Sequence, residues 1–143
     1  MAKKRVRALA LGIVRNADKI LLSEGYDPST KKLFYRPLGG SVEFQELAKD
    51  AVVREFKEEL GVVVVEPVML GFLENIFIYD GEPGHELVIV FEVKLQDAAL
   101  YQRASFARLD REGRAVWRSL AELQRAPLYP TGLLALFTPI CGE

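Results

Sequence analysis

Three glutamates on one predicted helix are the side chains best placed to do chemistry in this chain. The pattern of residues 46–60 predicts an α-helix that ends at Gly61, on which Glu55, Glu58 and Glu59 fall within about 100° of one another beside an apolar arc. Like charges at this spacing destabilise an isolated helix by roughly a few tenths of a kcal/mol per pair. A hard divalent cation such as Mg²⁺ offsets the repulsion, because it seeks clustered oxygen ligands and accepts phosphate oxygens in its remaining positions. The spacing therefore indicates metal-assisted chemistry on a phosphate.

A wider pattern of glycine, glutamate and arginine surrounds these carboxylates in residues 40–62. The positions that define it are Gly40, Glu46, Arg54, Glu55, Phe56, Glu58, Glu59, Gly61 and Val62. In this register the segment resembles the Nudix box, whose pattern is Gly, five residues, Glu, seven residues, then Arg-Glu-hydrophobic-any-Glu-Glu-any-Gly-hydrophobic. The positions of fixed identity would coincide by chance on the order of once in a million in such a chain. The flanking order of strands and terminal helices also resembles the Nudix fold, so the resemblance spans nearly the whole chain.

The resemblance implies both a fold and an activity. The implied fold class is α/β (α+β), with a Nudix-like α/β/α sandwich around a mixed β-sheet. The implied activity is hydrolysis, with Mg²⁺ or Mn²⁺, of a pyrophosphate bond in a nucleoside diphosphate linked to another group, as in a nucleoside triphosphate, a dinucleoside polyphosphate, ADP-ribose or a nucleotide sugar. One alternative is a catalytically inactive Nudix-fold module that binds or senses nucleotides, although intact glutamates argue against it. A purely structural, solvated acidic helix is the other alternative.

The resemblance also assigns roles within the segment. The three glutamates are expected as metal ligands, and the carbonyl of Gly40 as a further ligand. Arg54 is expected to orient the glutamates by ion pairing, and Glu46 is expected to support that network. The chain departs from the family pattern in two places, because Gln45 stands where a glycine is frequent and Pro37 stands one position earlier than in the frequent Leu-Pro-Gly-Gly. Both departures fall in the loop before the helix.

Four residues outside the segment are candidates for contacts with the substrate or the metal. Arg36 is a candidate for binding a substrate phosphate, with an exposed strand arginine as the alternative. Tyr35 is a candidate for stacking on a base, with a core position as the alternative. Tyr79 lies about where a tyrosine occurs in Nudix enzymes that cleave dinucleoside polyphosphates, which favours that substrate over a nucleoside triphosphate or ADP-ribose; packing at the end of a strand is the alternative. In the acidic loop 110–112, Glu112 is the choice for a further metal ligand, with an exposed loop residue as the alternative.

The elements that must position these residues are predicted from hydrophobic patterning and turn residues. Residues 6–14 are apolar at both parities, as in a strand covered on both faces, and are expected to form a hairpin with residues 19–23. Residues 37–40 predict an irregular backbone. Further strands are expected at 33–36, 62–65, 68–79, 86–95 and 114–118, and further helices at 120–125 and 131–137. This order of elements indicates a mixed sheet with helices packed against it.

Length, composition and charge set the class of protein. The 143 residues, half of them hydrophobic, favour a single domain over 1–143 that folds on its own. Lys and Arg number 19 and Asp and Glu number 20, and a formal charge of −1 gives no general attraction to extended nucleic acid or anionic lipid. No segment approaches the ~18 apolar residues that cross a membrane, and the single Cys141 cannot form an internal disulfide, which fits the cytoplasm. The expected partner is a small nucleoside diphosphate derivative, and a homodimer is left open.

Overall fold

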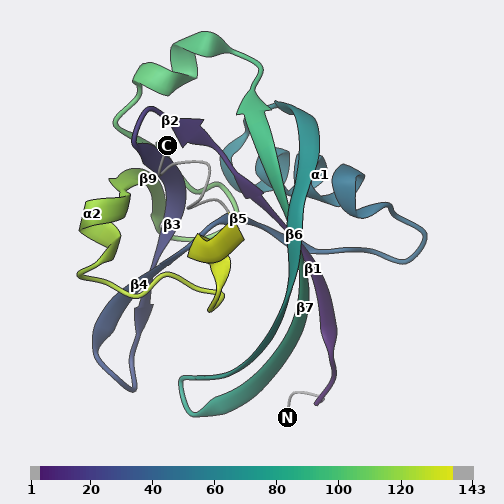
Figure 1. The fold of residues 1–143 in the computed structure, drawn as a ribbon, viewed down its shortest axis with the longest axis vertical. Coiled ribbons are helices and arrows are strands. Elements are labelled where there is room, and N and C mark those ends of the chain that lie inside the picture. Colours follow the sequence, from purple (N-terminus) through teal and green to yellow (C-terminus); the bar gives the residue numbers. More distant parts are fainter. Residues whose placement is uncertain (1–3, 137–143) are drawn as a thin grey trace.

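Two β-sheets form the centre of the protein (Figure 1). The structure is a computed structural model, and it describes residues 4–136. The first sheet has the order β5-β1-β7-β6, with bounds Leu38–Ser41, Arg7–Ile13, Glu82–Leu95 and Val64–Tyr79. The second sheet has the order β2-β3-β9-β8 with β4 beside β3, and its bounds are Arg15–Asn16, Lys19–Asp27, Arg114–Ser119, Ser105–Ala107 and Lys32–Arg36. Strand β1 runs parallel to β7 and antiparallel to β5, so the first sheet is mixed, as expected.

Helix α1, Ala48–Leu60, packs its apolar side against the first sheet. Phe56 is fully buried there, and it lies so close to β1 that a side-chain carbon at Gly12 would collide with the Phe56 ring. The helix ends at Gly61, whose φ of 71° is left-handed and whose N–H donates to the carbonyl of Lys57. The predicted end of the helix is therefore confirmed, whereas its observed start comes later than the predicted residue 46.

The loop before α1 explains this later start. Gln45 has a φ of 68°, the left-handed conformation that suits the glycine frequent in the family at this place. Glu46 then turns back on the loop, because its carboxylate accepts a hydrogen bond of 3.1 Å from the N–H of Glu43. Leu47 is the N-cap residue, so the helix begins at Ala48.

A second apolar core lies on the other face of the sheets, on the side of α2, and like the core under α1 it contains side chains of both sheets. Strand β1 alternates, so that Ala10 belongs to the core under α1 while Leu9 and Leu11 belong to the second core. The other buried side chains of this second core are Ile13, Ile20, Leu22, Tyr35, Val88, Val90, Val116, Leu123 and Leu133. Leu123 comes from the short helix α2, Leu120–Leu123, so α1 and α2 lie on opposite sides of the paired sheets (Figure 1).

Strand pairing near the amino terminus differs from the prediction. The expected hairpin is correct at its turn but wrong in most of its pairing: β3 pairs antiparallel with the short β2 and the Leu21 N–H donates to the Val14 carbonyl at 3.1 Å, whereas β1 belongs to the other sheet. The segment expected to be irregular includes strand β5, which pairs with β1. The pairing depends on Gly39, because its φ is 140° and a side-chain carbon there would collide with the carbonyl oxygen of Ala10.

Later elements differ from the prediction in extent. The two strands expected at 62–65 and 68–79 form the single strand β6, with register shifts between Val65 and Val68 and between Met69 and Gly71. Strand β8 and the 3₁₀ helix η1, Ala98–Gln102, were not predicted. The predicted helix 120–125 is shorter, and residues 133–136 are helical while the last residue of the predicted helix 131–137, and Cys141, lie outside the described residues.

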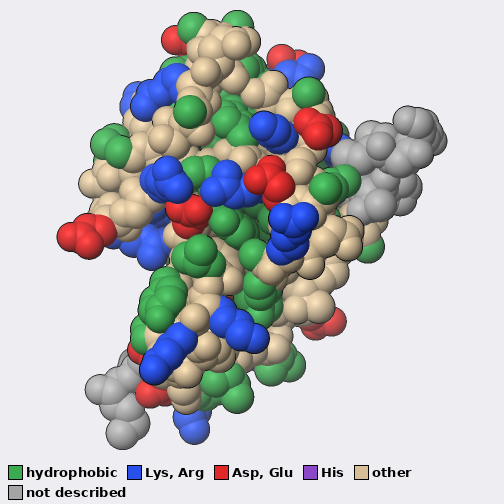
Figure 2. All heavy atoms as spheres, turned by 90° about the vertical axis from the view of Figure 1, so that its left-hand side faces the viewer, with side chains coloured by type: hydrophobic (Ala, Val, Ile, Leu, Met, Phe, Trp, Pro, Cys, Tyr) green, Lys and Arg blue, Asp and Glu red, His purple; other side chains and the backbone are tan. Residues whose placement is uncertain are grey.

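The surface beside β4 and α2 carries both signs of charge. Figure 2 shows Lys and Arg side chains gathered with Asp and Glu side chains across the middle of this face. On β3, Glu24 accepts hydrogen bonds from Arg114 at 2.8 Å and from Arg118 at 3.2 Å. Interspersed charges of this kind do not form the uniformly basic surface that attracts nucleic acid. Within residues 4–136, no helix is long and apolar enough to cross a membrane.

Candidate active site

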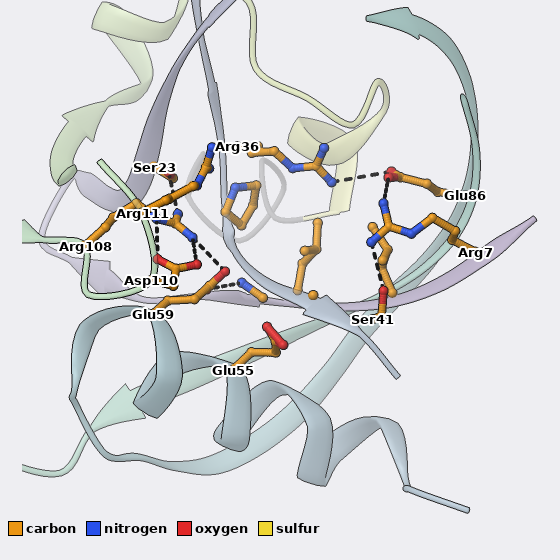
Figure 3. A pocket seen from close by; sticks show the side chains of 15 residues that line it. Arg7, Ser23, Arg36, Ser41, Glu55, Glu59, Glu86, Arg108, Asp110 and Arg111 are labelled. Carbon is orange, nitrogen blue, oxygen red and sulfur yellow. Dashed lines mark hydrogen bonds and ion pairs between the residues drawn. The ribbon is translucent and has the colours of Figure 1, made fainter. Parts of the chain in front are cut away.

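A cavity of about 450 Å³ lies where α1, β5 and the second sheet meet (Figure 3). Its acidic lining residues are Glu55, Glu59, Glu86 and Asp110, and its basic lining residues are Arg7, Arg36, Arg108 and Arg111. The backbone of Gly39 and Gly40 also lines it. The volume is in the range of sites that hold small ligands.

Glu55 projects from α1 into this cavity and lies against the backbone of β5 (Figure 3). A side-chain carbon at Gly40 would collide with the Glu55 carboxylate in its present position, so a larger residue there would displace the carboxylate. Burial raises the pKa of Glu55, although a hydrogen bond of 3.0 Å from Arg54 favours its charged form. The Glu55 carboxylate therefore lies directly against the backbone at Gly40.

Glu59 lies one helical turn from Glu55 and is deeply buried, with 7% of its surface exposed. Its Oε1 accepts a hydrogen bond of 3.0 Å from the N–H of Gly39, and its Oε2 accepts one of 2.9 Å from Arg108. Burial raises the pKa of Glu59 to about 7, even though Arg108 and the Gly39 N–H both favour the carboxylate. A cation bound at this carboxylate would replace the hydration that burial removes, and it would therefore favour the ionised form of Glu59.

Arg108 was missed by the sequence analysis. It follows strand β8, its side chain is only 4% exposed, and it also donates to the Ser23 hydroxyl at 2.8 Å and to both carboxylate oxygens of Asp110. Its guanidinium thus ties the helix carboxylate of Glu59 to the second sheet. No local sequence pattern marks this arginine, because its partners come from three separate parts of the chain.

Arg54 connects three glutamates of the loop and of α1 through one guanidinium group. Its guanidinium donates to Glu46 at 2.7 and 2.9 Å, to Glu55 at 3.0 Å and to Glu58 at 2.8 Å. It also donates to the carbonyl of Ser41 at 3.0 Å, which fastens α1 to β5. These hydrogen bonds from Arg54 lower the pKa of Glu46 to about 2. The 54% exposed side chain of Glu58 is thereby held outside the cavity lining.

The candidates outside the helix segment separate into those at the cavity and those away from it. Arg36 lines the cavity, as does Asp110 in the acidic loop, whereas Glu112 is exposed and does not line it. Tyr35 is 7% exposed and belongs to the second core, and its hydroxyl contacts Glu24.

Tyr79 lies at the end of β6, outside the cavity lining. Its hydroxyl donates to the carbonyl of Tyr26 at 3.4 Å, and its ring packs edge-on against Phe34 at 5.8 Å. The ring of Tyr129 also packs edge-on against Phe34, with the ring centroids again 5.8 Å apart. These contacts make an aromatic cluster at the surface of β4 and β6 that is separate from the carboxylates of α1.

The residues present fit a divalent cation with a small number of protein ligands. Among residues 4–136, no three His, Cys, Asp or Glu side chains converge into a metal cage. Mg²⁺ does not need one, because it is usually bound through one or two carboxylates together with water and substrate phosphates. Glu55, Glu59 and the backbone at Gly40, against which the Glu55 carboxylate lies, provide such a set on one wall.

Comparison with known proteins places this arrangement in a family. The model of the NUDIX domain matches residues 3–135. The chain belongs to the Nudix family. The predicted family, its mixed α and β fold and the expectation of a Nudix hydrolase are confirmed at this level.

Relatives and solved structures support the family assignment. An uncharacterized Nudix hydrolase of Bacillus subtilis, YvcI, is 24% identical over 82% of this chain and 69% of its own length. An ADP-ribose pyrophosphatase of Methanocaldococcus jannaschii is 40% identical over 81 residues, which span 56% of this chain and 46% of that protein. The solved MutT NUDIX hydrolase of Burkholderia pseudomallei has a TM-score of 0.69 at 23% identity, over 93% of this chain and 97% of that one. A NUDIX hydrolase of Nitrosomonas europaea has the same TM-score at 21% identity, over 97% and 91%. These structures share the Nudix fold with this chain.

Proposed function

We propose that this Nudix chain hydrolyses a pyrophosphate bond in a nucleoside diphosphate linked to another group, with Mg²⁺ or Mn²⁺ held by Glu55, Glu59 and the carbonyl of Gly40. Glu58 is retained in the proposal as a further ligand from the exposed side of α1. The observation that carries the proposal is the juxtaposition, in one cavity, of a carboxylate wall on α1 with arginines on the opposite side. Neither a solvated acidic helix nor a general apolar pocket has this arrangement.

The charges of the cavity support an anionic substrate. Four acidic and four arginine side chains line it, so the formal charges cancel. One bound divalent cation would leave the cavity positive, and a negatively charged diphosphate would then restore neutrality. The cavity is therefore matched to a metal and an anion together.

Each residue has a role in this scheme that follows from its contacts. When bound, the cation supplies charge neutralisation for the diphosphate and lowers the pKa of water. Glu55 and Glu59 hold it, and one of these buried carboxylates accepts the proton of the attacking water. Arg54 and Arg108 keep the two carboxylates oriented through the hydrogen bonds described above. Asp110 holds Arg108 from the loop side.

Several classes of nucleotide derivative are candidate substrates. The name of the Methanocaldococcus relative supports including ADP-ribose beside dinucleoside polyphosphates, nucleoside triphosphates and nucleotide sugars in a substrate panel. A cytoplasmic location stays a prediction that rests on the single cysteine. A homodimer also stays a prediction. Ile76 and Ile78 are exposed on the edge strand β6, where a second copy of the chain could pair. Light scattering of the purified chain tests this directly by measuring its mass in solution.

The experiment is a hydrolysis screen over this panel with Mg²⁺, Mn²⁺ or EDTA, with identification of the products. We expect metal-dependent cleavage at a diphosphate, a higher Tm in millimolar Mg²⁺, and loss of both effects in Glu55→Gln. Asp50→Asn is the matched control, because Asp50 is an exposed acid on the same helix outside the cavity. A metal-induced rise in Tm without turnover would support the binding module instead, and neither effect would support the structural acidic helix.

A further inference from the structure

A buried carboxylate holds two arginines on the cavity wall opposite α1. Glu86 of β7 is 3% exposed. Arg36 of β4 donates to its Oε1 at 3.4 Å, and Arg7 of β1 lies 3.8 Å from its Oε2 (Figure 3). The two arginine side chains are 27% and 48% exposed, so the guanidinium groups are more accessible to a ligand in the cavity than the Glu86 carboxylate that they share.

Most of the hydrogen-bonding capacity of these two arginines is unused. A guanidinium carries five N–H donors and stays charged at any working pH. Among the described residues, Arg36 contacts Glu86 as its one polar partner, and Arg7 contacts Glu86 and the Ser41 hydroxyl. Two positive charges against one negative charge leave a local excess of positive charge at this wall. Planar forks with free donors bind phosphate oxygens in pairs.

The position of Arg7 relates this wall to the carboxylates on α1. Arg7 donates to Ser41 at 2.8 Å, and Ser41 follows Gly40 directly on β5. Gly40 is the residue whose backbone meets Glu55. Arg7 and Arg36 therefore lie beside the proposed metal site, on the side of Ser41. A phosphate attached to the reacting diphosphate could extend in this direction.

We propose that Arg7 and Arg36 form a second phosphate-binding subsite, with Glu86 as the residue that positions them. This inference rests on the proposed function, and it names the substrate class. Substrates with a further phosphate beyond the reacting diphosphate, such as a nucleoside triphosphate or a dinucleoside polyphosphate, use the subsite. ADP-ribose and nucleotide sugars do not use it, because the group that follows their diphosphate is uncharged.

The test compares substrates in Arg36→Gln and Arg7→Gln. We expect KM to rise about tenfold or more for the polyphosphate substrates, as for the loss of a hydrogen bond to a charged group, with kcat nearly unchanged and KM for ADP-ribose unchanged. Arg125→Gln is the matched control, because it removes one positive charge at an exposed position outside the cavity. If the single variant does not fold, the double variant Arg36→Gln with Glu86→Gln repeats the test with one positive and one negative charge removed together, so that the local charge balance is kept.

A second measurement separates the subsite from the hydrolytic activity. Calorimetric titration with inorganic tripolyphosphate in EDTA is expected to show binding to the wild type and to Arg125→Gln, and about tenfold weaker binding to Arg36→Gln. Binding that depends on Arg36 in a chain without turnover would preserve the subsite while refuting the hydrolase. Equal KM changes for all substrates, or tripolyphosphate binding that is the same in Arg36→Gln and the wild type, would overturn the subsite and leave the hydrolase standing.

Discussion

The raised pKa of Glu59 predicts how the stability of the metal-free protein depends on pH. The ordinary pKa of 4.5 applies to the unfolded chain, whereas burial raises the pKa to about 7 in the folded protein. Between these values the folded state keeps a proton that the unfolded state has released, so the free energy of unfolding falls as pH rises. At 1.36 kcal/mol for each pKa unit, this contribution is about 3 kcal/mol, fully present below pH 4.5 and lost by about pH 7.

The assay is urea unfolding in EDTA at several values between about pH 5 and pH 8, for the wild type and Glu59→Gln. Glutamine cannot titrate, so the variant should lose less stability over this interval. Its absolute stability is not the readout, because the amide offers one acceptor to the two donors, Gly39 N–H and Arg108, that Glu59 satisfies. Burial raises the pKa of Glu55 too, which leaves the variant a smaller slope of the same sign.

Two controls and the choice of pH interval isolate the effect of Glu59. Glu46, with a pKa lowered to about 2, acts with the opposite sign but only below pH 4.5, outside the interval. Asp50→Asn should follow the wild type, because Asp50 is exposed. Millimolar Mg²⁺ should flatten the wild-type slope, since a cation favours the ionised carboxylate. The same pH slope in the wild type and Glu59→Gln would refute the reasoning.

Three further predictions address individual residues. Gly40→Ala should weaken Mg²⁺ binding about 10- to 100-fold, because the new carbon displaces the Glu55 carboxylate. Titration with Mg²⁺ measures the affinity, and an unchanged affinity would show that Glu55 is not a metal ligand. Asp110→Ala should lower kcat by releasing Arg108, whereas Glu112→Ala should leave kcat unchanged, because Glu112 does not line the cavity; the reverse order would restore the original choice of Glu112. Tyr79→Ala should leave KM unchanged while lowering Tm, since its ring packs on Phe34, and a raised KM would return it to the substrate site.

Local features of the site were predictable from the sequence. The helix and its end at Gly61 follow from periodicity and a left-handed cap, which depend on near neighbours. The same periodicity put three glutamates within one arc, but it does not say where their side chains turn. Two of them reach the cavity, while Glu58 is drawn to Arg54 on the exposed side.

Features that depend on distant contacts were not predictable. Arg108 and Glu86 acquire their roles from partners tens of residues away, and neither stands in a pattern with them. The expected pairing of residues 6–14 with 19–23 failed for a related reason, because an apolar run indicates burial but does not identify the neighbouring strand. The resemblance made Tyr79 a candidate for stacking on a base, and the structure places it at the end of β6 in a separate aromatic cluster, so its role in substrate binding stays a prediction to be tested.

The parallel pairing of β1 with β7 has a consequence for synthesis of the chain. Arg7 is in register with Glu86, so the first strand waits about 80 residues for its neighbour, which at about 5–20 residues per second is about 4 to 16 seconds. Its apolar residues have no completed sheet to join during that time. Pairings this distant also slow folding itself, because the chain must close a long loop before any contact compensates for it. We therefore expect the yield of folded protein in cells to depend on translation speed and on chaperones that shield the nascent amino terminus.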